Sequence, residues 1–317
     1  MKRSGFILLL VLIVLSVSTV IHSAIYTARV ESRFPETGLT LQINAVDAHV
    51  ITAGMQGKPV LLIHGAGANA RDFPPRLISK LSEQYRVFVP DRPGHGYSRR
   101  PKNAAQLAVQ ARQMAGVLEQ LAPGETAVIV GHSYGSAVAL RLALDKPELV
   151  AGLVLIAPVP FDWGPGHVAW HDTVAATPVL GTLFSHLMPI FGPSQARAGL
   201  SQSFAPAPEP QGHYDQAGID LMFRPQTFRA NAKDLAALGG ELALQQDRYG
   251  ELDMPVVIFS GAADQTIDST QQAERLRREH PRMKLISFED EGHFPHYRKA
   301  EVLLAEIEDL AAASDTD

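Results

Sequence analysis

The sequence contains no cysteine among its 317 residues. This absence excludes a disulfide framework, a zinc site with thiolate ligands and a cysteine nucleophile. Basic clusters are also missing: 28 Lys and Arg residues stand against 33 Asp and Glu residues, the net charge is -5, and basic residues never form a run longer than two or three. A nucleic-acid partner is therefore not expected, because such partners are bound through a basic patch.

The amino terminus carries a long apolar stretch. After Lys2 and Arg3 no charged residue appears before Arg29, and residues 6–15 are all apolar. A helix needs about 20 such residues to cross a bilayer, so residues 1–28 predict a single-span anchor that contacts the membrane through residues 4–28. A cleaved signal peptide is the alternative. The leading basic residues predict that this end stays in the cytoplasm and that the remaining chain is exported.

The pattern after the anchor predicts an α/β fold. Residues 29–38 are polar and predict a short tether. Residues 39–43 alternate between apolar and polar, which predicts a strand that pairs with residues 49–52 at an antiparallel edge. Apolar runs then alternate with helical patterns, and such alternation is typical of a doubly wound, mainly parallel sheet with helices on both faces. The runs lie at residues 60–63, 86–90, 127–130, 149–157, 256–259 and 283–288.

The strand pattern stops between residues 161 and 250, where prolines and aromatic residues accumulate. Ninety residues are too many for a loop, so we expect an inserted helical lid over the site. Its helices are expected within residues 167–189, 213–222 and 226–246. The core then comprises residues 39–160 and 251–313.

The central motif is Gly-His-Ser-Tyr-Gly at residues 131–135, which lies between a strand pattern and an Ala/Leu-rich helical pattern. A strand, a sharp turn and a helix in this order place the serine on a strained turn, and the flanking glycines leave room for the neighbouring elements. The free N–H groups and the positive end of the helix dipole point toward the reacting centre. Ser133 is therefore the predicted nucleophile.

A serine nucleophile needs a base and a carboxylate that orients the base. Asp264 and His293 each follow a predicted strand. Because ligand sites in open α/β sheets lie at the carboxyl ends of the strands, we expect Asp264 and His293 to meet Ser133.

Four further residues have competing interpretations. Asp268 is a second carboxylate near Asp264, but we expect it to cap the following helix. His296 competes with His293, and we expect it at the rim of the lid or capping the last helix. Asp91 lies beside Arg92, which indicates a structural ion pair between the two. His132 is expected to pack and to form hydrogen bonds inside the turn.

Two weaker signals concern ligands. His167 and His171 have a one-turn spacing that could hold zinc, but without a third ligand no metal site is expected. The segment His64-Gly65-Ala66-Gly67 follows a buried strand, and such a loop lets backbone N–H groups face a ligand.

Five motifs occur along the chain: His64-Gly-x-Gly, Asp91-Arg-x-Gly-His-Gly-x-Ser98, Gly131-His-Ser-x-Gly135, Gly261-x-x-Asp264 and Gly292-His293. Together these motifs resemble the α/β-hydrolase fold superfamily, in order and over residues 39–312. With the basic-flanked anchor, the chain resembles bacterial membrane-bound or exported esterases and lipases with a helical lid, and the resemblance implies a mostly parallel eight-stranded sheet.

The resemblance also implies roles for single residues. Ser133 attacks, His293 acts as general base and then as general acid, and Asp264 orients His293. The backbone N–H groups of Ala66 and Tyr134 form the oxyanion hole. No metal and no cofactor are implied. The residues expected to support the turn and the loop are His64, Gly65, Gly67, Gly131, His132 and Gly135.

The expected function is hydrolysis of carboxylic esters with apolar acyl groups through an acyl-enzyme, as in an esterase, lipase, phospholipase or lysophospholipase. Epoxide hydrolases and haloalkane dehalogenases of this fold carry an aspartate where this chain has Ser133. A C–C bond hydrolase, a cofactor-free peroxidase and a non-catalytic binding protein are the alternatives. The expected location is the bacterial inner membrane with the catalytic domain on the periplasmic side, or secretion after signal cleavage. The sequence is compatible with a homodimer.

Overall fold

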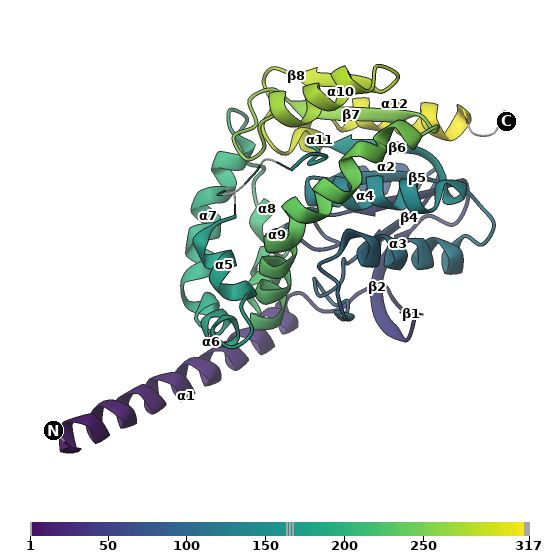
Figure 1. Ribbon diagram of the computed structural model, residues 1–317. Coiled ribbons are helices and arrows are strands. Elements are labelled where there is room, and N and C mark those ends of the chain that lie inside the picture. The colour runs from purple at the N-terminus through teal and green to yellow at the C-terminus, as the bar shows by residue number, and fades with distance from the viewer. Residues whose placement is uncertain (1, 163, 165, 167, 314–317) are drawn as a thin grey trace.

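An eight-stranded sheet forms the centre of the computed structural model, which describes residues 2–162, 164, 166 and 168–313 (Figure 1). The strand order is β1-β2-β4-β3-β5-β6-β7-β8. The pairs β1-β2 and β2-β4 are antiparallel, and all other pairs are parallel. This confirms the predicted mostly parallel sheet with an antiparallel edge. The strands are β1 (Leu39–Ile43), β2 (Val46–Ala53), β3 (Pro59–Ile63), β4 (Arg86–Pro90), β5 (Ala127–His132), β6 (Val150–Ile156), β7 (Val256–Gly261) and β8 (Lys284–Phe288).

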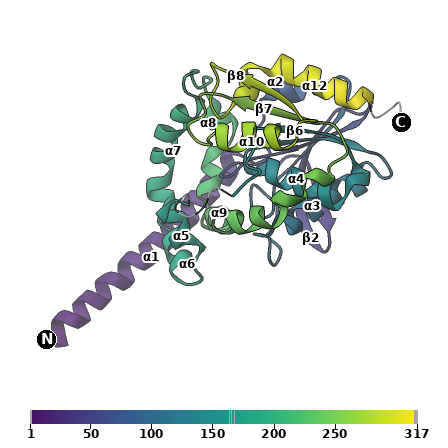
Figure 2. The same cartoon turned by 45° about the horizontal axis from the view of Figure 1, so that its top comes forward.

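The apolar runs form the middle strands because helices cover both faces of the sheet. In β3, Leu61 and Ile63 belong to one apolar cluster, and Val60 and Leu62 belong to the other. The first cluster includes α3 and α4, and the second includes α2 and α12 (Figure 2). The helical elements of this core are α2 (Pro75–Leu81), α3 (Leu107–Leu121), α4 (Tyr134–Asp145), the 3-10 helix η1 (Pro147–Leu149), the π-helix η4 (Thr270–Glu274), α10 (Arg275–Glu279), α11 (Pro295–Arg298) and α12 (Ala300–Ala313).

Helices fill the segment between β6 and β7, which is called the lid below (residues 161–250). The longest element of the lid is α9, and the C-terminal half of α9 packs on the core through Leu238 and Leu242. The sequence pattern did not indicate α7, because Pro189 and Pro193 disfavour a helix except in its first turn. The elements are α5 (Trp170–Ala176), α6 (Leu180–Ser185), α7 (Met188–Phe204), α8 (His213–Gln216), η2 (Ile219–Phe223), α9 (Pro225–Gln245) and η3 (Gln246–Glu251).

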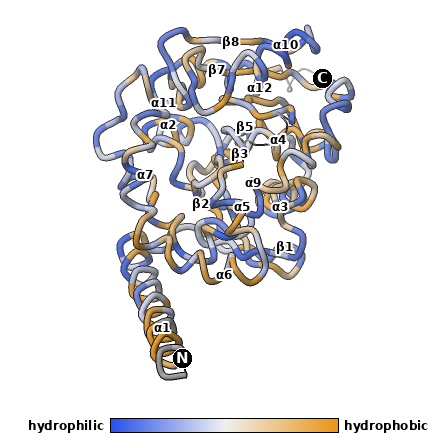
Figure 3. The backbone as a smooth tube through the Cα atoms, turned by 60° about the vertical axis from the view of Figure 1, so that its left-hand side comes forward, coloured by the Kyte–Doolittle hydropathy of each residue, from blue (hydrophilic) through white to orange (hydrophobic). Residues whose placement is uncertain are grey.

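The amino-terminal helix α1 (Lys2–Arg33) is longer than predicted. It is long and apolar enough to cross a membrane by length and composition, a test that a signal sequence also passes. Its apolar part projects away from the body of the molecule (Figure 3). Its other end continues through Arg33, so half of the segment predicted as a tether is helical, and Val30 is buried against the lid residue Leu221.

Candidate active site

Ser133 lies on a sharp turn between β5 and α4. Its φ and ψ angles are 51° and -119°, a backbone conformation that costs energy for a residue with a side chain. Its N–H donates to the carbonyl of Ile156 on β6 at 2.8 Å, which ties the turn to the sheet. A Cβ atom on Gly131 would lie 2.6 Å from the backbone oxygen of Gly135, and one on Gly135 would lie 2.2 Å from the oxygen of Ile63. Only glycine fits at either position, as the steric argument from the sequence requires.

His293 and Asp264 form a hydrogen bond of 2.7 Å between Nδ1 and Oδ2. Asp264 follows β7, and its other oxygen accepts the N–H groups of Thr266 at 2.7 Å and Ile267 at 3.0 Å. Burial by itself raises the pKa of the Asp264 carboxyl, but the charge and hydrogen bond of His293 and the two N–H donors together lower it below its usual value. The carboxylate is therefore ionised and Nδ1 donates to it. In the neutral ring, Nε2 is left as a proton acceptor.

A cavity of about 370 Å³ joins these groups to the lid. Ser133 and His293 both line it, as does the loop of residues 65–68. Apolar lid side chains form the opposite wall, namely Ala196, Leu200, Ile219, Met222 and Phe223. The lining residues that the structure describes include one carboxylate, that of Asp72, which is bonded to His132, and neither lysine nor arginine. The cavity therefore suits an uncharged, partly apolar molecule next to a serine and a histidine.

The two N–H groups predicted as an oxyanion hole belong to the loop after β3 and to the start of α4. Ala66 lines the cavity beside Ser133. Tyr134 is the first residue of α4, so its N–H has no acceptor within the helix. Its side chain points elsewhere: the ring lies 4.2 Å from the guanidinium carbon of Arg92, and the hydroxyl accepts a hydrogen bond from Gln110.

His64 holds the loop that contains Ala66. The N–H of Arg92 donates to Nε2 of His64 at 2.9 Å, so Nδ1 carries the proton and donates to the carbonyl of Gly65 at 2.9 Å. Complete burial, followed by the positive charge of Arg92, lowers the pKa of His64 to about 4. The neutral ring is thus fixed in one tautomer. On the lid side, the N–H of Gly67 donates to Asn231 of α9 at 2.7 Å.

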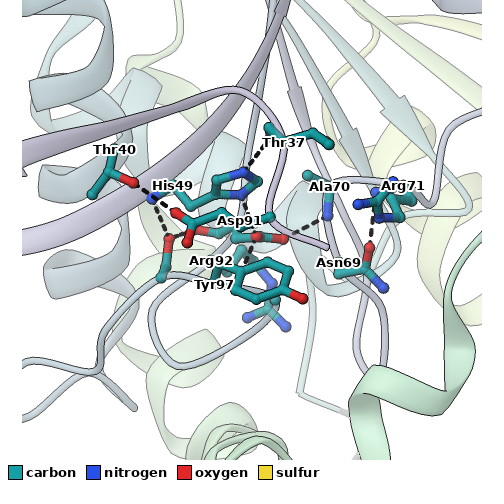
Figure 4. A network of polar contacts seen from close by, with 12 residues as sticks. Thr37, Thr40, His49, Asn69, Ala70, Arg71, Asp91, Arg92 and Tyr97 are labelled. Atoms are coloured by element: carbon teal, nitrogen blue, oxygen red, sulfur yellow. Dashed lines mark hydrogen bonds and ion pairs between the residues drawn. The ribbon is translucent and has the colours of Figure 1, made fainter. Parts of the chain in front are cut away.

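Asp91 and Arg92 do not pair with each other, so that expectation was wrong. Asp91 bonds His49 on β2 at 2.6 Å and accepts the N–H groups of Ala70 and Tyr97 (Figure 4). The side chain of Arg92 reaches Asp234 of the lid at 3.1 Å. Both residues lie just past the end of β4, and their side chains find partners on different elements, β2 and the lid helix α9.

His132 joins the nucleophile's strand to the loop of His293. Its Nδ1 lies 3.0 Å from Asp72 and its Nε2 lies 3.1 Å from the carbonyl oxygen of His293. Although burial opposes ionisation, the hydrogen bond and charge of His132 keep the pKa of Asp72 far below its usual value. His132 therefore bridges Asp72 and the backbone of the His293 loop. Sequence reasoning missed Asp72, because it follows no strand and belongs to no motif.

His296 is buried inside the core, so its expected place at the lid rim or as a helix cap was wrong. Its ring centroid lies 4.8 Å from that of His132 and 5.8 Å from that of Phe73. The short helix α11 turns it inward. Asp268 does cap the following turn, because one of its oxygens accepts the N–H groups of Thr270 and Gln271. His167 lies outside the described residues, and among the described ones there is no group of three or more metal-ligating side chains.

Comparison with known proteins identifies relatives over most of the chain. The family described as alpha/beta hydrolase fold matches residues 58–300. The chain is 30% identical over 277 residues to the 2-hydroxymuconate semialdehyde hydrolase of Pseudomonas putida, covering 82% of this chain and 89% of that one. It is 29% identical over 257 residues to the pimeloyl-[acyl-carrier protein] methyl ester esterase of Nitrosomonas europaea, covering 78% and 92%.

Two other similarities show less, one because it covers a third of the chain and the other because the sequence identity is low. The chain is 44% identical to the magnesium-chelatase 30 kDa subunit of Rhodobacter capsulatus, but only over 108 residues, which are 33% of this chain and 37% of that one. The solved structure of an esterase from Exiguobacterium antarcticum superimposes with a TM-score of 0.68 at 23% identity, over 86% of this chain and all of that one. At this identity the likeness concerns the fold alone.

Proposed function

Because the chain belongs to the α/β-hydrolase fold family, we propose that it is a serine hydrolase. The oxygen of Ser133 bonds to the carbonyl carbon of the substrate while His293 Nε2 takes the hydroxyl proton, and Asp264 stabilises the resulting imidazolium. The N–H groups of Ala66 and Tyr134 stabilise the oxyanion. The C–O bond to the alkoxide then breaks, and the alkoxide receives the proton from His293. Water hydrolyses the acyl-enzyme by the same steps.

The substrate is an uncharged carboxylic ester with an apolar acyl group. The observation that carries this choice is the cavity wall: the lid contributes apolar side chains, and the described lining residues include no lysine or arginine that could pair with an anionic substrate. A buried carboxylate without a partner would be strongly disfavoured there. The similarity to an esterase over 78% of the chain supports the same choice.

His213 of the lid is the group that recognises the polar part of this ester. Its side chain lines the cavity, is buried, and has no partner for either ring nitrogen among the described residues. Burial lowers its pKa, which favours the neutral ring with one donor and one acceptor. A buried polar group without a partner is costly, and a ligand atom removes that cost.

A C–C bond hydrolase is the second candidate, because a semialdehyde hydrolase is 30% identical over 82% of the chain. The substrate in that relative's name, 2-hydroxymuconate semialdehyde, carries a carboxylate. The absence of lysine and arginine from the described cavity lining argues against such a substrate here.

The protein acts while anchored to a bacterial inner membrane by α1, with the hydrolase domain on the periplasmic side. The packing of α1 supports retention of the anchor. Ser23 is buried and bonds His186 of the lid at 2.6 Å, and Tyr26 donates to the carbonyl of Asp220 at 3.0 Å. Cleavage after residues 16–18 would leave this packed half of the helix without the part that crosses the membrane. The purified mature protein should therefore begin at or near Met1, and a soluble form that begins near Thr19 would contradict the anchor.

The test of the reaction is hydrolysis of nitrophenyl esters from acetate to palmitate by the full chain in detergent. Because α1 packs against the lid, the full chain is preferable to a truncated domain. We expect activity that rises with acyl length to an optimum, and its near-complete loss in Ser133→Ala. A folded wild-type protein that hydrolyses none of these esters, but cleaves a C–C bond in a vinylogous diketone, would favour the second candidate.

A further inference from the structure

Helix α1 has two halves with different surroundings. From Ser23 onward one side of it packs against the lid: Ser23 and Val30 are buried, as is Phe34 just past the end of the helix, while Ile25 on the other side is 46% exposed. Before Ser23 its described apolar side chains are exposed, from 68% at Phe6 to 45% at Val20. The change in burial marks the position along α1 at which the protein body ends.

This position agrees with the length of a membrane span. Residues 4–22 form about 19 residues of helix, or roughly 30 Å, which matches the thickness of the hydrocarbon core. On the proposed anchoring, the membrane surface therefore lies near Val20 to Ser23. Any lid element at the same level along α1 touches the bilayer.

Helix α6 lies at that level. A groove of about 610 Å³ separates it from α1, and its lining includes Val20, Ser23 and Ala24 of α1 together with Thr182 and Ser185 of α6. Across the groove His186, which follows α6, bonds Ser23. Figure 1 shows α6 at the end of the lid from which α1 leaves the molecule.

The lid exposes large apolar side chains around α6, and these form what we call the basal face. Three of them, Val179, Leu180 and Leu183, belong to α6 or directly precede it. Trp170 of α5 joins them, because its ring contacts Phe184 at a centroid distance of 5.9 Å. The exposed fractions are 71% for Trp170, 73% for Val179, 66% for Leu180, 58% for Leu183, 45% for Ile190 and 53% for Phe191.

Charge is absent from the same stretch. Between Asp172 and Arg197 the sequence contains no Asp, Glu, Lys or Arg. A lid that faced water on this side would carry charged residues among its exposed positions, and an exposed apolar patch of this kind marks a contact with another apolar surface. Tryptophan is enriched where a protein meets the membrane surface.

We propose that the basal face of the lid lies in the membrane surface beside α1, so that the lid is itself a membrane-contacting element. This inference rests on the proposed anchoring of α1. Helix α7 then connects the membrane to the catalytic cavity: Phe191 near its start lies on the basal face, and Leu200 near its end lines the cavity. The ester substrate enters from the lipid phase along this lid.

The test places the full-length protein in phospholipid vesicles and measures quenching of Trp170 by brominated lipids. The chain has two tryptophans, so Trp163→Phe leaves Trp170 as the only fluorophore. We expect blue-shifted emission that is quenched more strongly by lipids brominated near the glycerol than by lipids brominated at the chain end.

A matched control uses Leu244 at the far end of α9, which is 71% exposed, as Trp170 is. A tryptophan introduced there by Leu244→Trp, in a chain with Trp163→Phe and Trp170→Phe, should emit as in water and should not be quenched. The double variant Leu180→Asp, Leu183→Asp should raise the KM for long-chain esters carried in vesicles and leave hydrolysis of a short, water-soluble ester unchanged.

The two proposals fail in different ways. Alkaline carbonate extraction of the same vesicles reports whether α1 is inserted. If the protein stays in the membrane but Trp170 is not quenched, the basal-face inference is wrong and the anchoring stands. If carbonate releases the protein and Trp170 is not quenched, both are wrong. Ester hydrolysis in detergent tests the catalytic proposal separately.

Discussion

The change Asp264→Asn tests the triad most directly, because the structure dictates which way the new amide must face. One oxygen of Asp264 accepts two backbone N–H groups, and the other accepts Nδ1–H of His293. In the asparagine variant the amide oxygen should keep the two N–H donors. If the amide turned the other way, two N–H groups would face its NH₂ group at a cost of about 1–3 kcal/mol each.

The amide NH₂ therefore faces His293, and Nδ1 must accept a hydrogen bond from it. The proton of the neutral ring moves to Nε2, which can no longer take the proton of Ser133. An equivalent exchange in a serine protease lowers kcat about 10⁴-fold, which corresponds to roughly 5.5 kcal/mol. We expect a loss of this size here, with a folded protein.

The assay compares kcat for a nitrophenyl ester between the wild type and Asp264→Asn, with Ser133→Ala as the baseline and thermal unfolding as the check on folding. Asp268→Asn is the matched control, because Asp268 also accepts two backbone N–H groups but does not contact a histidine. Its kcat should be unchanged. An Asp264→Asn enzyme within about tenfold of the wild type would refute the assigned role of Asp264, since the tautomer argument requires far more.

Three further predictions concern the fold around the site. A Cβ atom on Gly135 would lie 2.2 Å from a backbone oxygen of β3, so Gly135→Ala should fail to give soluble protein, and a well-folded variant would show that the turn can relax. Asp234→Ala should lower the free energy of unfolding in urea by about 3–5 kcal/mol, because it leaves the buried guanidinium of Arg92 unpaired; a change below about 1 kcal/mol would contradict this. Burial lowers the pKa of His49, but the bond to Asp91 more than offsets this and raises it above its usual value. The contribution of His49 to stability is therefore complete below about pH 6.5 and is lost as the pH rises through the raised pKa. The free energy of unfolding in urea should therefore decline less above that pH in His49→Gln than in the wild type.

The local sequence pattern was sufficient to predict the strands of the sheet and the turn that carries Ser133. A run such as residues 127–130 is buried on both faces, and its apolar character along the whole strand reports that burial directly. The glycines at 131 and 135 reflect contacts with elements adjacent in the chain or in the sheet. The order of strands and of the polar residues that follow them was therefore readable from the sequence.

Partners that come from distant segments were not readable in this way. Asp72 reaches His132 across 60 residues, and Arg92 reaches Asp234 across 142 residues. Nothing in the neighbouring residues indicates such a partner, because the pairing depends on how the lid and the loops fold over the sheet. The interior position of His296 has the same origin.

The sequence by itself determined the family resemblance, the strand order along the chain and the apolar character of α1, because each depends on residues close together in the chain. Only the tertiary structure decided how α1 meets the lid. The helix is continuous through Arg33, and its burial changes at Ser23 because the lid packs against one half and leaves the other half exposed. A hydropathy pattern cannot report that contact, since the lid residues that meet Ser23 and Val30, among them His186 and Leu221, lie far away in the sequence.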